Sequence, residues 1–290
     1  MQNKRRVQRD LKWLIESPDF LSVANLNLQH QCDLMNASDL VKNASEDSDD
    51  FTFEPTHRLG VYFEQLWHHL IRSQSGLKLL RYNQQVIIEK KTLGEFDSII
   101  RLLSTQQTLH CELAVKFYLQ VGQGEKMAGW VGPNLRDRFD RKFLRLLNHQ
   151  LALSTLPEVQ QWLHKEKLTL DGFGLLTRGR LFYSLDNFLN QQFEYPVEVE
   201  RDHLKGFWMT HKELKDYQKH TDFEWYQLPR MYWLSELTVV DCGDVSRVNQ
   251  LSDNQLVKLV AMKDGKELMR GFVVTDEWLE KARQRVLTRV

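Results

Sequence analysis

The chain has few cysteines and no net charge, and each shortage argues against a class of protein. Its 290 residues include three cysteines, Cys32, Cys111 and Cys242, none of them at a paired spacing. This usage argues against a zinc knuckle or a disulfide framework and is typical of the reducing cytoplasm. Lysine plus arginine and aspartate plus glutamate both number 39, so any surface that binds a polyanion must be local.

Long apolar runs and the short signatures of common enzyme classes are also missing. No run of about 18 apolar residues occurs, so we expect no membrane span. The basic first residues lack the apolar centre of a signal peptide. The glycines of residues 122–134 match neither GxxxxGK(S/T) nor a strand-anchored GxGxxG, and the chain contains no GxSxG and no HExxH. Nucleotide-binding loops, serine hydrolases and zinc proteases of these types are therefore not indicated.

What the chain does contain is a composition typical of a folded globular protein. Hydrophobic residues make up 42% and charged residues 27% of its 290 residues, a length that allows one large or two modest domains. An acidic run of small residues over 43–50 predicts a loop and a boundary. We expect an N-terminal helical arm over 1–54, an α/β core over 55–185 and a C-terminal α+β extension over 186–290.

Hydrophobic periodicity predicts the order of elements in this core. Apolar residues at helical spacing predict helices over 58–73 and 134–153, the second capped by Asn134. Apolar or alternating runs predict strands. The predicted strands are 77–89, 93–103, 109–121, 168–176 and 179–183, the last two joined by a turn at 177–178. This order predicts a mixed central sheet flanked by helices in α-β-β-β-α-β order.

Three charged residues interrupt the apolar strands at the centre of this pattern. Asp97 lies in an alternating run, and Glu112 and Lys116 lie in a following run that is apolar almost throughout. A period of two places Glu112, Ala114 and Lys116 on one face of their strand. Carboxylates and lysines are seldom buried without a partner or a metal. The conflict between the apolar pattern and these charges indicates a functional site.

Two explanations of these charges are open. In the first, the buried carboxylates have a metal as their partner. In the second, Glu112 and Lys116 form a buried ion pair, and Asp97 caps a turn. Buried pairs cost desolvation and are weak stabilisers, so we favour the cation.

Two further groups of charged residues lie near these strands in the sequence. Four basic residues lie in the helix predicted over 134–153, and they are Arg138, Arg141, Lys142 and Arg145. They either contact the phosphates of a nucleic acid or form a solvated helix face. Glu64 borders the apolar face of the helix over 58–73, where it is either a carboxylate of the site or a solvated one.

The core resembles a known nuclease superfamily. Gly94-x-x-Asp97, followed by Glu112 in an apolar strand and set in this order of elements, is similar to the PD-(D/E)XK nuclease-like superfamily. Glu64 matches a helix carboxylate found in part of that superfamily. Longer segments resemble a bacterial family of unknown function placed within it. These segments are Arg9-Asp10-Leu11-Lys12-Trp13, Ser17-Pro18, Gly94-Glu95-Phe96-Asp97, Glu112-Leu113-Ala114-Val115-Lys116-Phe117-Tyr118-Leu119 and Gly132-Pro133-Asn134-Leu135.

The resemblance implies a restriction-endonuclease-like fold and a metal-dependent nuclease. Its substrate would be a phosphodiester bond in nucleic acid, with DNA favoured over RNA. Asp97 and Glu112 would hold Mg²⁺ or Mn²⁺, with Glu64 as an outer or second-metal ligand. The metal would stabilise charge on the scissile phosphate and help to deprotonate a water molecule. Lys116 would assist by neutralising the charge that develops.

One position departs from the superfamily pattern, which places a lysine two residues after the glutamate. This chain has Ala114 there. Lys116 lies on the same face, about 6–7 Å further along the strand. Lys142, Arg138 or Arg141 could serve from the following helix instead. The alternative is a catalytically silent scaffold that binds nucleic acid or a partner protein.

Overall fold

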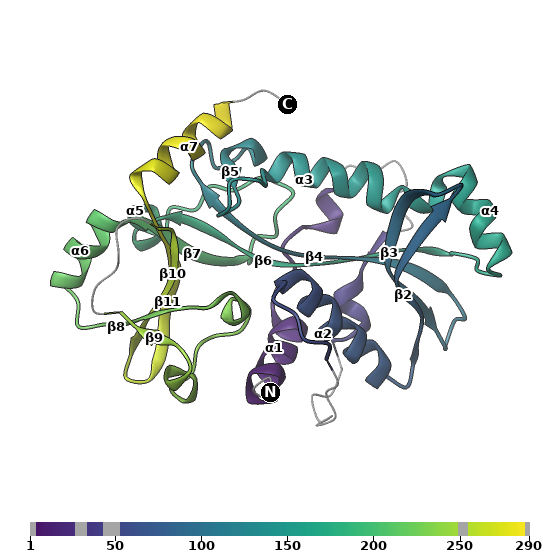
Figure 1. Cartoon of the computed structure of the whole chain (residues 1–290), viewed down its shortest axis with the longest axis horizontal. Helices are drawn as coiled ribbons and strands as arrows, with labels where there is room; N and C mark the ends of the chain where they lie inside the picture. The colour runs from purple at the N-terminus through teal and green to yellow at the C-terminus, as the bar shows by residue number, and fades with distance from the viewer. Residues whose placement is uncertain (1–3, 27–33, 43–52, 249–254, 288–290) are drawn as a thin grey trace. The chain divides into compact units, whose positions relative to one another are not determined.

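The computed structural model describes residues 4–26, 34–42, 53–248 and 255–287 (Figure 1). The acidic run predicted over 43–50 lies outside these residues.

The chain folds into two compact units, each made of two separate stretches of sequence. The first unit is Met1–Val115 with Lys142–Arg178, and the second is Lys116–Arg141 with Gly179–Val290. The chain passes from one unit to the other within continuous strands and a helix. The unit boundaries therefore do not coincide with the predicted breaks after residues 54 and 185.

The first unit is built on an antiparallel meander. Its strands β2 (Leu77–Ile88), β3 (Lys91–Leu102) and β4 (Thr108–Gln120) pair in that order. The next strand in the order is the first part of β6 (Gly172–Ser184), which pairs in parallel with β1 (Leu34–Asn36). The three strands predicted over residues 77–121 are confirmed to within two residues at each end.

Helices pack on the meander through apolar stripes. α2 (Leu59–Ser73) confirms the helix predicted over 58–73 and meets β3 where Trp67 Nε1 donates to Ser98 Oγ at 3.1 Å. α1 (Lys4–Glu16) packs beside α2, whose Tyr62 hydroxyl donates to Asp10 at 2.8 Å. α4 (Pro157–Lys165) joins a cluster with β2 and β3. Its buried members are Val86, Phe96, Ile99, Leu153, Val159, Leu163 and Leu168.

The helix predicted over 134–153 is shorter than expected. α3 (Phe139–Arg145) begins five residues later and continues as a π-helical turn over Leu146–Leu151. Residues 132–138 form a turn in which Leu135 has a φ of 59°, and Arg138 bridges to Val131. Asn134 does not cap a helix, because its side chain accepts the Arg136 N–H inside this turn at 3.0 Å.

The second unit is also a mixed sheet with helices. Its parallel strands are the end of β6, β7 (Leu204–Thr210) and β11 (Lys266–Val274). From β11 the sheet continues antiparallel through β10 (Val257–Lys263), β8 (Glu224–Gln227) and β9 (Ser246–Arg247), while β5 (Trp130–Val131) pairs with the end of β4. Its helices are α5 (Leu185–Leu189), α6 (His211–Lys219) and α7 (Asp276–Leu287). The predicted α/β class, with a large mixed sheet flanked by helices, is confirmed.

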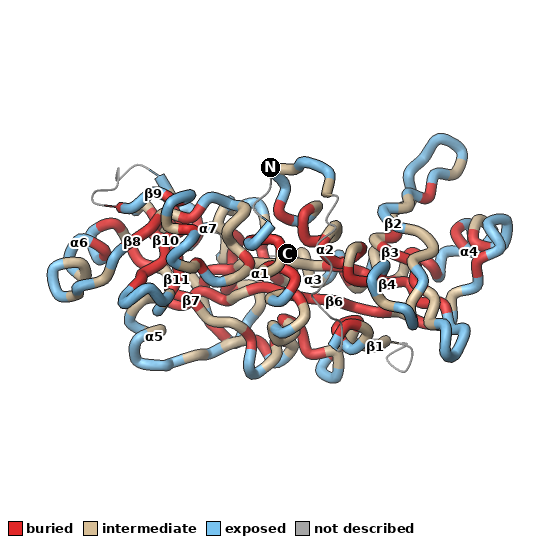
Figure 2. Tube along the Cα trace, turned by 90° about the horizontal axis from the view of Figure 1, so that it is seen from below, coloured by how far each residue is buried: buried red, intermediate tan, exposed pale blue. Residues whose placement is uncertain are grey.

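The predicted turn at Thr177 and Arg178 is wrong, because β6 is one continuous strand that is buried along most of its length (Figure 2). The polar pair has partners in the interior instead. Thr177 Oγ1 accepts the Leu21 N–H at 2.9 Å, and Arg178 Nε donates to the Leu14 carbonyl at 3.0 Å. Gly179 follows with a φ of 156°, where a Cβ would lie 2.0 Å from the Lys116 carbonyl oxygen, so only glycine fits.

Candidate functional site

The site begins where the ladder between β3 and β4 stops. The paired residues run from Arg101 and Thr108 to Ser98 and Cys111. Beyond that pair the Asp97 carboxylate, rather than a strand carbonyl, accepts the Leu113 N–H at 2.8 Å. The Asp97 side chain thus occupies the place of a ladder bond, and it does not cap a turn. The arrangement brings the carboxyl groups of Asp97 and Glu112 together on facing strands.

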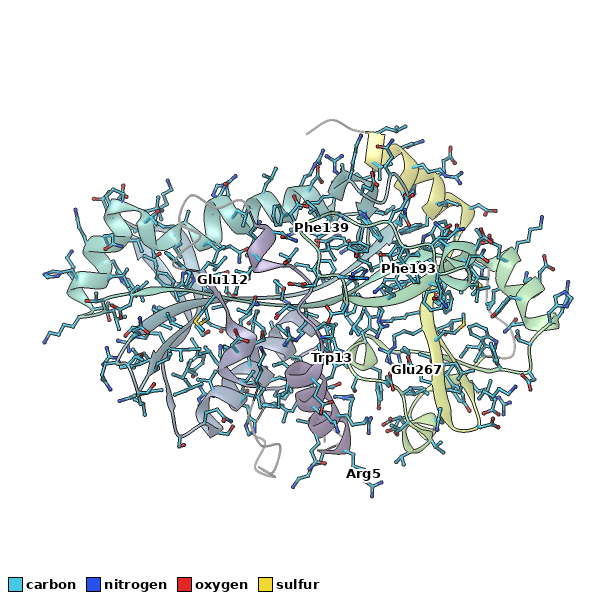
Figure 3. The ribbon with its side chains drawn as sticks, turned by 180° about the vertical axis from the view of Figure 1, so that it is seen from behind. Arg5, Trp13, Glu112, Phe139, Phe193 and Glu267 are labelled. Atoms are coloured by element: carbon cyan, nitrogen blue, oxygen red, sulfur yellow. The ribbon has the colours of Figure 1, made fainter. Side chains whose placement is uncertain are left out.

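Glu112 is fully buried and held at both oxygens. Its exposed fraction is 0%, and Figure 3 labels it on its strand. His110 Nε2 lies 2.7 Å from Oε1, and Gln150 Nε2 donates to Oε2 at 2.7 Å. Gln150 comes from the π-helical turn after α3, and such turns frequently occur at functional sites. The carboxyl group is therefore fixed in one orientation.

The two carboxyl groups are coupled. Burial and the charge of Glu112 raise the pKa of Asp97 well above its usual value. Burial also raises the pKa of Glu112 to about 8, against the lowering effect of its hydrogen bonds. Two interacting buried carboxyl groups resist being ionised together. Burial lowers the pKa of His110 to about 4, so this imidazole is neutral at pH 7 and does not balance their charge.

Glu64 brings a third carboxylate to the edge of the pair. It lies on α2, half-buried, and accepts the Asn83 side-chain N–H from β2 at 3.1 Å. Burial, and next the charge of Asp97, raise the pKa of Glu64 to about 7. One helical turn further on, His68 Nε2 lies 3.1 Å from the Asp97 carbonyl oxygen. The helix thus presents both side chains to the same part of β3.

The remaining candidates are placed differently. Lys116 is half-buried and belongs to the second unit, so its assisting role stays a prediction. Glu112 already has His110 and Gln150 at its two oxygens, which makes an ion pair with Lys116 unnecessary to explain its burial. Ala114 is half-buried in the strand position where the superfamily pattern has lysine.

The basic residues predicted to contact nucleic acid do not form one stripe. Arg138 is 1% exposed, donates from Nε and Nη2 to Asp140 at 2.7 and 2.8 Å, and binds the Arg285 carbonyl through Nη1. Its predicted contact with nucleic acid is wrong, because it precedes α3 and its guanidinium is buried in this pair. Arg145 is exposed on α3, and Arg141 and Lys142 are half-buried there.

The donor set suits a cation only in part. Within the described stretches of the chain, no three His, Cys, Asp or Glu side chains form a group that could hold a metal ion. Asp97 and Glu112 supply two carboxylates. Mg²⁺ is often bound by one or two carboxylates, several waters and the phosphates of a substrate. The pair therefore fits a cation whose coordination is completed by substrate and water, and it does not fit a closed protein cage.

Four polar residues around the carboxylates were missed by the sequence argument. The strand period could have identified His110, because this residue lies two positions before Glu112 and therefore shares its strand face. Gln150, His68 and Asn83 reach the site from three other elements, and only the tertiary structure brings them there.

The fold and this site define an α/β protein with a mixed sheet and a buried carboxylate cluster. The chain belongs to the family described as a domain of unknown function, DUF1853, whose model matches residues 9–287. No curated protein matches the chain, and no solved structure does. In the parts of the chain that the structure describes, no helix is long and apolar enough to cross a membrane.

Proposed function

We propose that the protein is a metal-dependent nuclease of the PD-(D/E)XK type, in which Asp97 and Glu112 hold Mg²⁺ or Mn²⁺. The observation that carries the proposal is the buried pair itself. Two carboxyl groups on facing strands are buried and resist being ionised together, and the Leu113 and Gln150 amide groups that donate to them are neutral. A divalent cation relieves the repulsion that otherwise keeps such a pair protonated.

The residues around the pair have definite tasks in this proposal. Gln150 and His110 hold the Glu112 carboxylate, and the Leu113 N–H holds that of Asp97. Glu64 adds negative charge beside Asp97 and is the candidate outer ligand. The bound cation would stabilise charge on the scissile phosphate and lower the pKa of a bound water. Lys116 is the predicted group that neutralises developing charge.

The wider arrangement supports the same proposal. Along the chain α2 is followed by β2, β3 and β4 and then by α3 and β6, with β5 and α4 in addition, and we propose that these elements form a restriction-endonuclease-like core. DNA is the first substrate to test and RNA the second. We also propose a cytoplasmic location, which the cysteine usage indicates.

A second candidate is a silent scaffold that binds nucleic acid or a partner protein. Two observations favour it. Ala114 occupies the position where the superfamily pattern has lysine, and both oxygens of Glu112 already have hydrogen-bonding partners within the protein. A scaffold of this kind would bind without turnover.

The deciding experiment is a cleavage assay with Mg²⁺ or Mn²⁺ on plasmid DNA, single-stranded DNA and RNA. Wild type is compared with Asp97→Asn and Glu112→Gln, which keep shape and remove charge. Glu166→Gln is the matched control, because Glu166 is an exposed carboxylate paired with Arg81 at 3.4 Å. Cleavage by wild type and by Glu166→Gln, with none by Asp97→Asn or Glu112→Gln, supports the nuclease. No cleavage of any substrate, with nucleic acid still bound, favours the scaffold.

A further inference from the structure

A line of polar side chains extends from the carboxylates along α2. Glu64, His68 and Arg72 follow one another at four-residue spacing, which places them on one face of the helix. Burial, and next the charge of Asp97, raise the pKa of Glu64, and His68 Nε2 lies 3.1 Å from the Asp97 carbonyl oxygen. Arg72, in the last turn, is exposed. The line therefore leads from the buried carboxylates to solvent.

An exposed tyrosine on β2 lies against the outer end of this line. Tyr82 has an exposed fraction of 56%. Its ring centroid is 5.2 Å from that of His68, and the Arg72 guanidinium carbon lies 4.8 Å from its ring centroid. The next residue, Asn83, donates to Glu64 and has a φ of 45°. The backbone at this point is thus fixed by the carboxylate site, and it presents the tyrosine beside that site.

Tyr82 and Arg72 together have the chemistry needed to bind one nucleotide. A tyrosine ring offers a face on which any base can stack, and arginine adds a cation over the same ring. An arginine stacked on an aromatic ring keeps its in-plane N–H groups directed outward, where they can bind a phosphate. A base in an intact duplex is already stacked on its neighbours, so only an unpaired base can use the ring.

We propose that Tyr82 and Arg72 bind one unpaired nucleotide of the substrate next to the carboxylates, the base on Tyr82 and a phosphate on Arg72. The inference rests on the proposed nuclease function and names its substrate class, single-stranded nucleic acid or a locally opened duplex. Tyr82 and Arg72 are specificity-determining residues in this account, and neither takes part in the chemical step.

The same strand provides a matched control. Ile87 on β2 is also large, apolar and exposed, with an exposed fraction of 54%. Figure 2 shows that much of β2 is exposed or half-buried, so the exposure of Tyr82 alone does not distinguish it. What distinguishes Tyr82 is the Arg72 cation over its ring and the neighbouring Asn83, whose side chain donates to Glu64.

The test measures binding of a short fluorescent single-stranded DNA by anisotropy, with Mg²⁺ and in a Glu112→Gln background that prevents cleavage. Adding Tyr82→Ala is expected to raise the Kd about tenfold, the effect of losing one stacked base. Tyr82→Phe and Ile87→Ala are expected to stay within about twofold of the background. Arg72→Ala is expected to weaken binding and to lower the slope of log K against log salt by about one.

Three results would overturn the inference. The first is a Kd for Tyr82→Ala within twofold of the background. The second is a loss of affinity in Ile87→Ala as large as that in Tyr82→Ala. The third is a Tyr82→Ala variant that loses as much affinity for an end-closed duplex as for the single strand. The nuclease proposal is judged separately, from cleavage by wild type and its loss in Glu112→Gln. Cleavage in which Tyr82→Ala retains the wild-type KM for single strands would remove the inference and leave the nuclease standing.

Discussion

Each unit contains a buried cluster of charged groups, and the two clusters are balanced in different ways. In the second unit, Lys258 has an exposed fraction of 2% and lies near Arg270 and Arg180. Four rings surround its amino group at 4.4 to 5.6 Å from their centroids, and they belong to Phe117, Phe182, Trp233 and Phe272. Burial, and next the charges of Arg270 and Arg180, lower the pKa of Lys258 well below its usual value.

The second cluster is compensated by its own chain. Arg270 donates to Glu267, which Figure 3 labels, and to the carbonyl oxygens of Trp233, Leu234 and Ser235. Burial opposes ionisation of Glu267, but the charge and hydrogen bonds of Arg270 outweigh it and lower the pKa of this carboxyl. The aromatic rings also favour a nearby cation. These hydrogen bonds hold the segment 233–237 against β11, so the cluster stabilises the fold.

The carboxylate cluster of the first unit lacks such compensation. The Asn83 and Gln150 side-chain amides and the Leu113 backbone N–H donate to it, and the imidazole beside it is neutral at pH 7. Burial therefore raises the pKa values of all three carboxyl groups without an opposing positive charge to lower them as Arg270 does for Glu267. A buried charge cluster is therefore structural where the protein balances its charge, and it indicates a ligand where the protein leaves that charge unbalanced.

The largest expected effect is on cleavage. Glu112→Gln or Asp97→Asn should reduce metal-dependent cleavage to background, about a thousandfold or more, because each removes charge that stabilises the cation at the reacting phosphate. Rates with Mg²⁺ on matched substrates measure this. Full activity in both variants would show that the pair is not the metal site.

The next effect is on stability and concerns the second cluster. Glu267→Gln should lower the free energy of unfolding by about 3–5 kcal/mol, because it leaves the buried Arg270 without its counter-charge. Denaturant unfolding measures the loss. Lys258→Met is the control, since it keeps the side-chain volume and removes an amine whose charged form burial already disfavours, and it should change stability by no more than about 1 kcal/mol. A loss in Lys258→Met as large as in Glu267→Gln would contradict this account.

The third effect is a dependence of stability on pH. The folded pKa values of Glu64 and Glu112, about 7 and about 8, lie above their usual value of 4.5. The folded state therefore holds more protons than the unfolded state between about pH 4.5 and 8, so the free energy of unfolding should fall as pH rises through this range. The slope is about 1.4 kcal/mol per pH unit for each proton retained.

Two measurements sharpen the pH prediction. Glu112→Gln should flatten the profile and be more stable than wild type at pH 8, because it removes a buried group that resists ionisation. Mg²⁺ should raise the Tm of wild type at pH 8 and leave that of Glu112→Gln unchanged. A wild-type stability that rises from pH 5 to pH 8 would show that other groups dominate.

The smallest expected effect concerns the basic residues of α3. Arg145→Ala should weaken nucleic-acid binding about threefold and reduce its salt dependence by about one unit of slope, because Arg145 is exposed and can reach one phosphate. Arg138→Ala should act through stability instead, since its guanidinium is buried against Asp140. Binding titrations at several salt concentrations, together with melting curves, distinguish the two.

The helix and strands that carry the carboxylates were predictable because their signals are local. The apolar stripe of α2 and the apolar or alternating runs of β2, β3 and β4 depend on periodicities of about 3.6 and 2 residues. The same local reasoning failed where polar residues have distant partners. Thr177 and Arg178 carry the composition of a turn, yet contacts with Leu21 and Leu14 keep them in a strand.

The sequence by itself determined the α/β class and, to within two residues, the limits of the central strands. A strand period of two and a short connection leave few other arrangements for them. Only the tertiary structure decided that Gln150 fixes Glu112 and that Asp140 removes Arg138 from the surface. It also decided that Tyr82 lies under Arg72. These contacts join residues whose separation in sequence carries no periodic signal, so the packing of whole elements sets them.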